Sequence, residues 1–218
     1  MAISACVVGA SGLVGRELVA QLLNDADVAA VHVIVRRSLN DFGNNPKLSQ
    51  HVIDFENIAA ADWPVCDVLC CCLGTTIKIA GSQEAFRRVD FDYVVESGKK
   101  ARQAGATRLL VVSAMGANRH SGIFYNRVKG EMEAAIASLG FSSVMIFRPS
   151  FLTGERSDTP KRRGENLAAT VLKFGNFLLP KKYQSLPGHA VARSMLLSLQ
   201  KASRGVCIVE SDEMQKNK

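Results

Sequence analysis

Three side chains in the middle of the chain have the types and spacing of a proton-transfer site. Ser113 ends an apolar run, and Tyr125 and Lys129 follow four residues apart in a segment with helical periodicity. Residues four apart lie on one face of a helix, so the tyrosine and the lysine would be neighbours. A free tyrosine has a pKa of about 10, and a nearby ammonium group favours the tyrosinate and lowers that pKa. We therefore expect Tyr125 to act as general acid and base, Lys129 to lower its pKa, and Ser113 to hydrogen-bond the substrate oxygen.

The spacing Tyr-x-x-x-Lys is a weak motif by itself, and its place after Ser113 makes it more specific. The apolar side chains of the same segment recur at helical spacing on what we take to be the opposite face, at Phe124, Val128 and Met132. The core would then need neither Tyr125 nor Lys129.

Three glycines near the start of the chain have the spacing of a loop that binds a dinucleotide. Gly9, Gly12 and Gly15 stand between an apolar, strand-like run and a segment with helical spacing. Glycines in this context allow a tight turn, let the backbone approach a pyrophosphate, and let the helix lie close to the sheet. Plain turn residues are the alternative, but the position between strand and helix favours nucleotide binding. The loop residues expected to contact the cofactor are Gly9, Ser11, Gly12, Leu13, Val14 and Gly15. We expect Tyr125 and Lys129 to contact the other end of the same cofactor, with Lys129 holding the nicotinamide ribose.

Two arginines end the second apolar run, where NAD enzymes usually carry a carboxylate for the ribose hydroxyl. Arg36 and Arg37 would instead bind a 2′-phosphate, because a guanidinium group holds phosphate in a bidentate manner. The pair favours NADP over NAD, although two solvated arginines are the plainer alternative. Asp54 and Phe55, which end the third run, are placed to meet the adenine, although Asp54 could simply cap the following turn.

Short apolar runs alternate with segments of helical periodicity along most of the chain. The predicted strands are Ala2–Val8, Val31–Val35, His51–Phe55, Val65–Leu73, Arg108–Ser113, Ser143–Phe147 and Val206–Val209. The clearest predicted helices start after Gly12 or span Ser82–Ala104, Phe124–Leu139 and Val191–Leu199. This alternation predicts an α/β fold, a Rossmann-type doubly wound parallel sheet of order 3-2-1-4-5-6 plus a C-terminal strand. We expect a single domain over residues 1–218, with a small substrate-side appendage at 150–204 that is partly helical at 167–179.

The formal net charge of +7 comes from the last third of the chain. Residues 156–218 hold 12 Lys and Arg against 5 Asp and Glu. This excess would attract an anionic substrate or an acidic protein partner, although a solvated basic face is the plainer interpretation. The sequence lacks the interleaved aromatic residues of a base-stacking platform, so we expect no nucleic-acid binding.

The cysteines and histidines do not suggest a metal site. Most of the six cysteines lie in apolar runs, and Cys70, Cys71 and Cys72 would alternate sides of a strand. We therefore expect the cysteines to be small core residues of a protein in a reducing compartment, and we expect no metal site. The N-terminus shows no basic leader, and no apolar run approaches the roughly 18 residues that cross a bilayer. We expect a cytoplasmic protein without a membrane partner.

Seven stretches resemble the atypical and extended short-chain dehydrogenase/reductases, and most of all the Tat-interactive protein (HTATIP-like oxidoreductase) family. The resemblance runs nearly end to end. The matching stretches are Gly9–Gly15, Val35–Arg37, Val52–Glu56, Cys72–Thr76, Arg88–Tyr93, Tyr125–Glu131 and Phe147–Pro149.

The resemblance implies an NADPH-binding fold that carries the triad of Ser113, Tyr125 and Lys129. It further implies that two short segments line the cofactor near the nicotinamide. These are Leu73, Gly74 and Thr75 in the first, and Arg148 and Pro149 in the second. The region after Pro149 is shorter than the substrate domain of sugar-nucleotide epimerases, so nucleotide-sugar chemistry is not implied, and the active-site Asn of the classical branch has no clear equivalent.

Two functions agree with these residues. The first is an NADP-dependent oxidoreductase of the short-chain type that acts on a small carbonyl or alcohol. The second is a non-catalytic NADPH-binding regulator that holds a protein partner. The intact triad favours the enzyme, because a sensor of cofactor does not need Tyr125 and Lys129 at this spacing.

Overall fold

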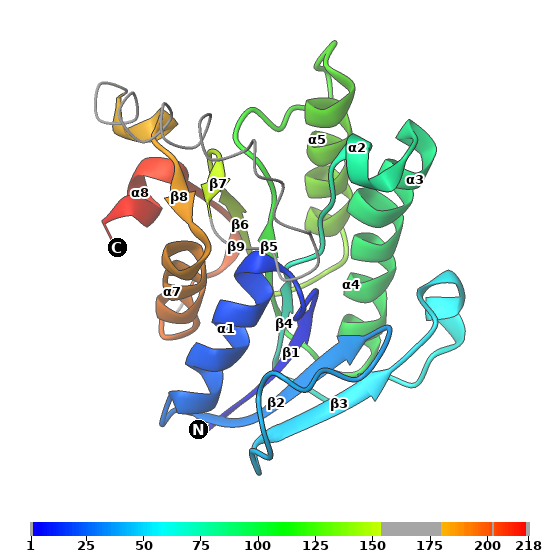
Figure 1. Ribbon diagram of the computed structural model, residues 1–218, viewed down its shortest axis with the longest axis vertical. Coiled ribbons are helices and arrows are strands. Elements are labelled where there is room, and N and C mark those ends of the chain that lie inside the picture. Colours follow the sequence, from blue (N-terminus) through cyan, green and yellow to red (C-terminus); the bar gives the residue numbers. More distant parts are fainter. Residues whose placement is uncertain (1, 154–179, 202, 217–218) are drawn as a thin grey trace, which may run out of the picture.

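The computed structural model describes residues 2–153, 180–201 and 203–216. Within them, seven strands form one sheet in the order β3-β2-β1-β4-β5-β6-β9, and each neighbouring pair is parallel (Figure 1). The strands are β1 (Ile3–Val8), β2 (Val28–Val35), β3 (Leu48–Val52), β4 (Val68–Cys71), β5 (Arg108–Val112), β6 (Ser143–Arg148) and β9 (Gly205–Glu210). The predicted doubly wound sheet, including its C-terminal strand, is confirmed.

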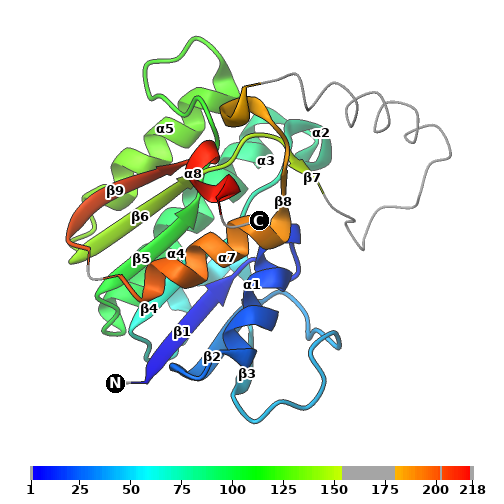
Figure 2. The same ribbon diagram turned by 90° about the vertical axis from the view of Figure 1, so that its left-hand side faces the viewer.

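Helices cover both faces of this sheet (Figures 1 and 2). The helices α1 (Leu13–Asn24) and α7 (Gly188–Leu199) pack on one face, while α4 (Tyr93–Gln103) and α5 (Phe124–Ala137) pack on the other. Successive strand residues alternate between the two resulting cores, as Val7 and Val8 do in β1. A parallel sheet buried on both faces explains why the strands read as continuous apolar runs.

The expected appendage at 150–204 contains a helix that belongs to the main fold. Ala190, Val191 and Met195 of α7 are fully buried in the same core as α1. A Cβ atom at Gly188 would lie 2.8 Å from the side chain of Leu13, so the two helices touch at their N-terminal ends. A short pair of strands, β7 (Leu152–Thr153) and β8 (Leu186–Pro187), precedes α7. The remainder of the expected appendage, including the helical segment 167–179, lies mostly outside the described residues.

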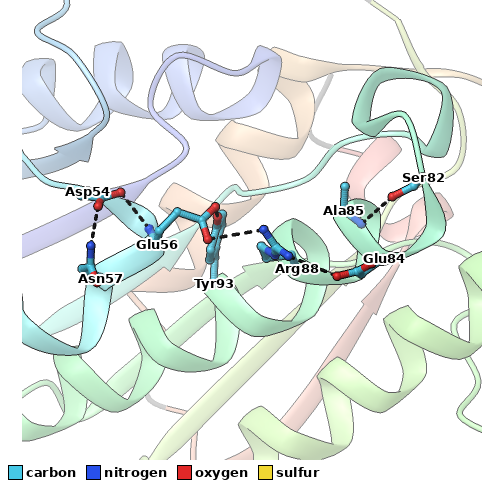
Figure 3. Close-up of polar contacts among 8 residues, drawn as sticks. All are labelled: Asp54, Glu56, Asn57, Ser82, Glu84, Ala85, Arg88 and Tyr93. Carbon is cyan, nitrogen blue, oxygen red and sulfur yellow. Dashed lines mark hydrogen bonds and ion pairs between the residues drawn. The ribbon is translucent and has the colours of Figure 1, made fainter.

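The third strand lies earlier than predicted. The expected strand His51–Phe55 is observed at Leu48–Val52, and a 3-10 segment, η1 (Phe55–Ala60), follows it. Asp54 caps this segment, because its carboxylate accepts hydrogen bonds from the Glu56 backbone N–H at 3.0 Å and from Asn57 Nδ2 at 2.6 Å (Figure 3). Aspartate favours such turns over strands, which is why the strand ends before it.

The helix expected at Ser82–Ala104 is divided into three parts after a short α2 (Ile77–Ala80). These are α3 (Gln83–Arg87), a π-helical segment η2 (Arg88–Asp92), and α4. Ser82 caps α3 by accepting the Ala85 N–H at 3.0 Å, and Arg88 lies between Glu84 and Glu56 (Figure 3). The wider turn of η2 places Asp90 in the interior, where it is fully buried.

Candidate cofactor and proton-transfer site

The three glycines of the first loop interlock with one another and with the strand beside them. Gly9 has φ +85°, and a Cβ atom there would lie 2.6 Å from the carbonyl carbon of Cys72. A Cβ atom at Gly15 would lie 2.1 Å from the Gly9 carbonyl oxygen, which also accepts the Gly12 N–H at 3.0 Å. Any larger side chain at Gly9 or Gly15 would push the loop off the sheet.

The start of α1 has the geometry of a phosphate-binding site. Gly12 is the N-cap residue and provides no side-chain cap. The N–H groups of the first helical turn have no partner within the helix, and the helix dipole adds partial positive charge there. The residues present therefore fit the pyrophosphate of a dinucleotide, because backbone donors point out of a loop that only glycines can form.

The segment after β4 lies against this loop. The Cys72 N–H donates to the Val8 carbonyl at 2.8 Å, and the Leu73 backbone nitrogen would be 2.8 Å from a Cβ atom at Gly9. The predicted cofactor-lining segment Leu73, Gly74 and Thr75 thus leaves the sheet beside the glycine loop. Gly74 itself is exposed.

The two arginines follow the carboxyl end of β2, at the same edge of the sheet. Both Arg36 and Arg37 are exposed. The loop that follows them is tied back to α1, since Arg16 forms an ion pair with Asp41 at 2.9 Å.

The two residues expected at the adenine have other partners. The Asp54 carboxylate caps η1, which was the alternative expectation for it. Phe55 is a core residue: only 6% of it is exposed, and its ring lies 5.5 Å from that of Tyr93. Phe55 opens η1 and belongs to the core between the sheet and α4.

Lys129 is buried, contrary to the expectation that the core would not need it. Its Nζ atom forms an ion pair with Asp90 Oδ1 at 2.7 Å, and the two side chains are 3% and 1% exposed. Burial alone would lower the pKa of Lys129, but Asp90 and then Tyr125 more than offset this, so the pKa is raised above its usual value. Lys129 therefore carries its charge at neutral pH and lies within electrostatic reach of Tyr125.

Ser113 is directed to a different part of α5. Its hydroxyl donates to Glu133 Oε1 at 2.6 Å, and both residues are buried. Glu133 lies about two helical turns, or about 12 Å, beyond Tyr125 along α5. The structure thus brings Tyr125 and Lys129 together but gives the Ser113 hydroxyl a separate partner.

Arg148 completes the network around Glu133. Its Nε and Nη2 atoms donate to the two oxygens of Glu133 at 3.0 and 2.6 Å, and its Nη1 atom is 3.4 Å from Glu210. Pro149, which follows it, is buried, and its carbonyl accepts the Met115 N–H at 3.0 Å. The guanidinium of Arg148, predicted beside the nicotinamide, is thus used in joining β6, α5 and β9.

The sequence interpretation missed Asp90 and Glu133. Asp90 stands four residues from both Phe86 and Val94, which are buried on the same side of the α3–α4 segment. A carboxylate on such an apolar stripe indicates a buried partner of opposite charge, and that signal was present in the sequence.

The described residues add two observations about metals and membranes. No group of three potential metal ligands occurs among them, and no helix in this part of the chain is both long and apolar enough to span a membrane. Burial raises the pKa of Cys70 to about 12 and that of Cys71 to about 11, so both remain thiols. The cysteines of β4 are core residues, as expected.

Comparison with known proteins identifies the family. A family model described as NAD(P)H-binding matches residues 9–171. The rat protein HTATIP2 is 37% identical over 204 residues, covering 90% of this chain and 81% of the rat protein. The mitochondrial protein FMP52 of Eremothecium gossypii is 30% identical over 222 residues, covering 97% and 95%.

Solved structures with the same fold include two Bordetella bronchiseptica enzymes. WbmG, solved with NAD and UDP, superposes with a TM-score of 0.70 at 17% identity, over 99% of this chain and 76% of its own. WbmH, solved with NAD⁺, gives 0.71 at 12% identity, over 96% and 76%. At these identities the likeness concerns the fold alone.

The expectation of a cytoplasmic protein is contradicted, because several fungal relatives are named mitochondrial. A missing basic leader was too weak a signal to assign a compartment. The glycine loop, the sheet order and the matched sequences agree on the family: this chain belongs to the NAD(P)H-binding family that includes HTATIP2.

Proposed function

We propose that this protein is an NADP-dependent oxidoreductase that interconverts a small carbonyl compound and its alcohol. The observation that carries the proposal is the placement of Tyr125 beside a buried, charged Lys129 at the carboxyl edge of the sheet. A tyrosine with an adjacent ammonium group is suited to exchange a proton with a substrate oxygen.

The cofactor would lie across the carboxyl ends of the strands, where the strand order reverses between β1 and β4. The first turn of α1 would hold the pyrophosphate, and Arg36 and Arg37 would hold the 2′-phosphate that distinguishes NADP from NAD. When bound, the reduced cofactor supplies a hydride to the carbonyl carbon.

Two side chains of α5, Tyr125 and Lys129, carry out the proposed proton transfer. In reduction, Tyr125 donates its phenolic proton to the carbonyl oxygen, which becomes the hydroxyl of the alcohol. Lys129 stabilises the resulting phenolate and would bind the nicotinamide ribose. We propose a supporting role for Ser113, which holds the end of β5 to α5 through Glu133.

The charge of the substrate is a separate proposal. The excess of Lys and Arg in residues 156–218 favours an anionic carbonyl compound. Five of these basic residues, between 156 and 173, lie outside the described residues.

Turnover of NADPH tests the proposed activity. We expect NADPH to be oxidised with at least one member of a panel of neutral and anionic aldehydes and ketones. Tyr125→Phe should lower kcat by at least about 100-fold without weakening NADPH binding, because only the proton donor is lost. The matched control Tyr183→Phe, at a half-exposed tyrosine, should leave kcat unchanged.

A regulator that binds NADPH without catalysis is the second candidate. It is favoured by the buried hydrogen bond from Ser113 to Glu133, which leaves the substrate without the predicted serine donor. NADPH binding without turnover on any member of the panel would support this candidate over the enzyme, whereas Tyr125→Phe should bind NADPH like the unsubstituted protein in both cases.

A further inference from the structure

The proton-transfer site proposed above leaves one buried carboxylate without a role. Asp90 Oδ1 lies 2.7 Å from Lys129 Nζ and has no hydrogen-bond partner besides this ammonium group among the described residues. Its other oxygen accepts the Thr75 N–H at 2.9 Å. Asp90 therefore ties the segment after β4 to α5 at one point.

This ion pair lies at the expected cofactor position. A Cβ atom at Gly74 would be 3.5 Å from Asp90 Oδ1 and 3.9 Å from Lys129 Nζ, so the buried pair lies directly beneath the exposed Gly74. One turn earlier on each helix, the ring of Tyr125 lies 5.3 Å from that of Phe86. Tyr125 thus lies against Phe86, and one helical turn later Lys129 lies against Asp90.

We propose that Asp90 is a positioning residue that keeps the Tyr125–Lys129 pair fully protonated, so that Tyr125 remains a proton donor to higher pH. The use made of that proton rests on the proposed function; the electrostatic effect does not.

Charge balance in a buried site is the physical reason. With Asp90 present, the charges of the phenol, the ammonium and the carboxylate sum to zero, and losing a proton leaves a net negative charge at the buried Lys129 and Asp90 and the partly buried Tyr125. Without the carboxylate the site begins at +1, and losing a proton neutralises it. Burial penalises net charge, so the first proton leaves at lower pH in the second case, whether Tyr125 or Lys129 releases it.

Among the described residues, Cys71 and Arg87 do not change this balance. Cys71 of β4 lies within electrostatic reach of Lys129 and Asp90, but burial raises its pKa to about 11 and it stays neutral. Arg87 of α3 is paired with Glu131 on α5, which compensates its charge.

Titration of the free protein tests the proposal without substrate or cofactor. The ultraviolet absorbance of tyrosinate, taken as a difference against Tyr125→Phe, follows Tyr125; Tyr93 stays separate because burial and Glu56 raise its pKa to about 12. Carbon NMR of labelled lysine, assigned with Lys129→Met, follows Lys129. In Asp90→Asn, the first deprotonation of the pair should move down by at least about one pH unit.

Two variants separate charge from packing. Asp90→Glu keeps the charge and should restore the original titration, while Asp92→Asn removes an exposed charge from the same segment and should change nothing. If Asp90→Asn lowers only the melting temperature and leaves both titrations in place, the proposal is overturned.

The unsubstituted protein provides a second measurement should Asp90→Asn fail to fold. Both Tyr125 and Lys129 should keep their protons up to about pH 9, about one unit below the ordinary value for free tyrosine because of the adjacent ammonium group. A first loss below about pH 9 would overturn the proposal. If no turnover is detected, the proposed function is contradicted, but these titrations still test the role of Asp90.

Discussion

The glycine loop after β1 and the inner face of α5 lie at the same edge of the sheet, but different contacts hold them. In the loop, backbone meets backbone, and Gly9 and Gly15 are required because any Cβ atom would strike a carbonyl group. On α5, charged side chains meet partners from distant parts of the chain, as Lys129 meets Asp90 and Glu133 meets Arg148. Residue type alone therefore reveals the loop, whereas the ion pairs appear only in the folded chain.

The largest effect should come from breaking the better buried of the two ion pairs. Lys129→Met leaves the Asp90 carboxylate buried without its counter-ion, and we expect the free energy of unfolding to fall by about 3–5 kcal/mol. Chemical denaturation measures this. The control Lys99→Met removes an exposed lysine paired with Glu96 and should cost less than about 1 kcal/mol. Equal losses in the two variants would show that burial of the pair does not matter.

A somewhat smaller effect is expected in the loop. Gly15→Ala forces a Cβ atom against the Gly9 carbonyl, and we expect about 3 kcal/mol of lost stability together with weaker cofactor binding. Gly122→Ala is the matched control, since a Cβ atom there meets nothing within 4 Å. A Gly15→Ala protein as stable as this control would contradict the described packing of the loop.

The smallest effect should come from Ser113→Ala. The variant loses one hydrogen bond to a buried carboxylate that Arg148 still compensates, so we expect a loss of about 1.5 kcal/mol. NADPH affinity should not change, because the hydroxyl faces Glu133. A large drop in kcat with full stability would instead place Ser113 on the substrate, as the sequence predicted.

The comparison of the glycine loop with α5 also explains which parts of the structure could be predicted from the sequence. The sheet order and the glycine loop could be predicted, because strand periodicity and glycine spacing are local properties. The shift of β3 and the π-helical segment η2 were not predicted. The sequence indicated that Asp54 could cap a turn but not that the strand ends before it, and η2 depends on burying Asp90 against Lys129, 39 positions away.

The positions of the candidate site residues also depend partly on local sequence and partly on contacts between distant residues. Tyr125 and Lys129 are neighbours because they share a helix, whereas Ser113 was assigned from its place after a strand. The direction of its hydroxyl depends on Glu133 and Arg148, neither of which the motif contains.

The central claim is that the first turn of α1 binds a dinucleotide and that Arg36 and Arg37 select its phosphorylated form. Isothermal titration calorimetry with NADPH and with NADH tests this most directly. We expect NADPH to bind at least about tenfold more tightly, and an Arg36→Ser, Arg37→Ser double variant to lose that preference while keeping its NADH affinity. Absence of binding by both cofactors, or an unchanged preference in the double variant, would contradict the account.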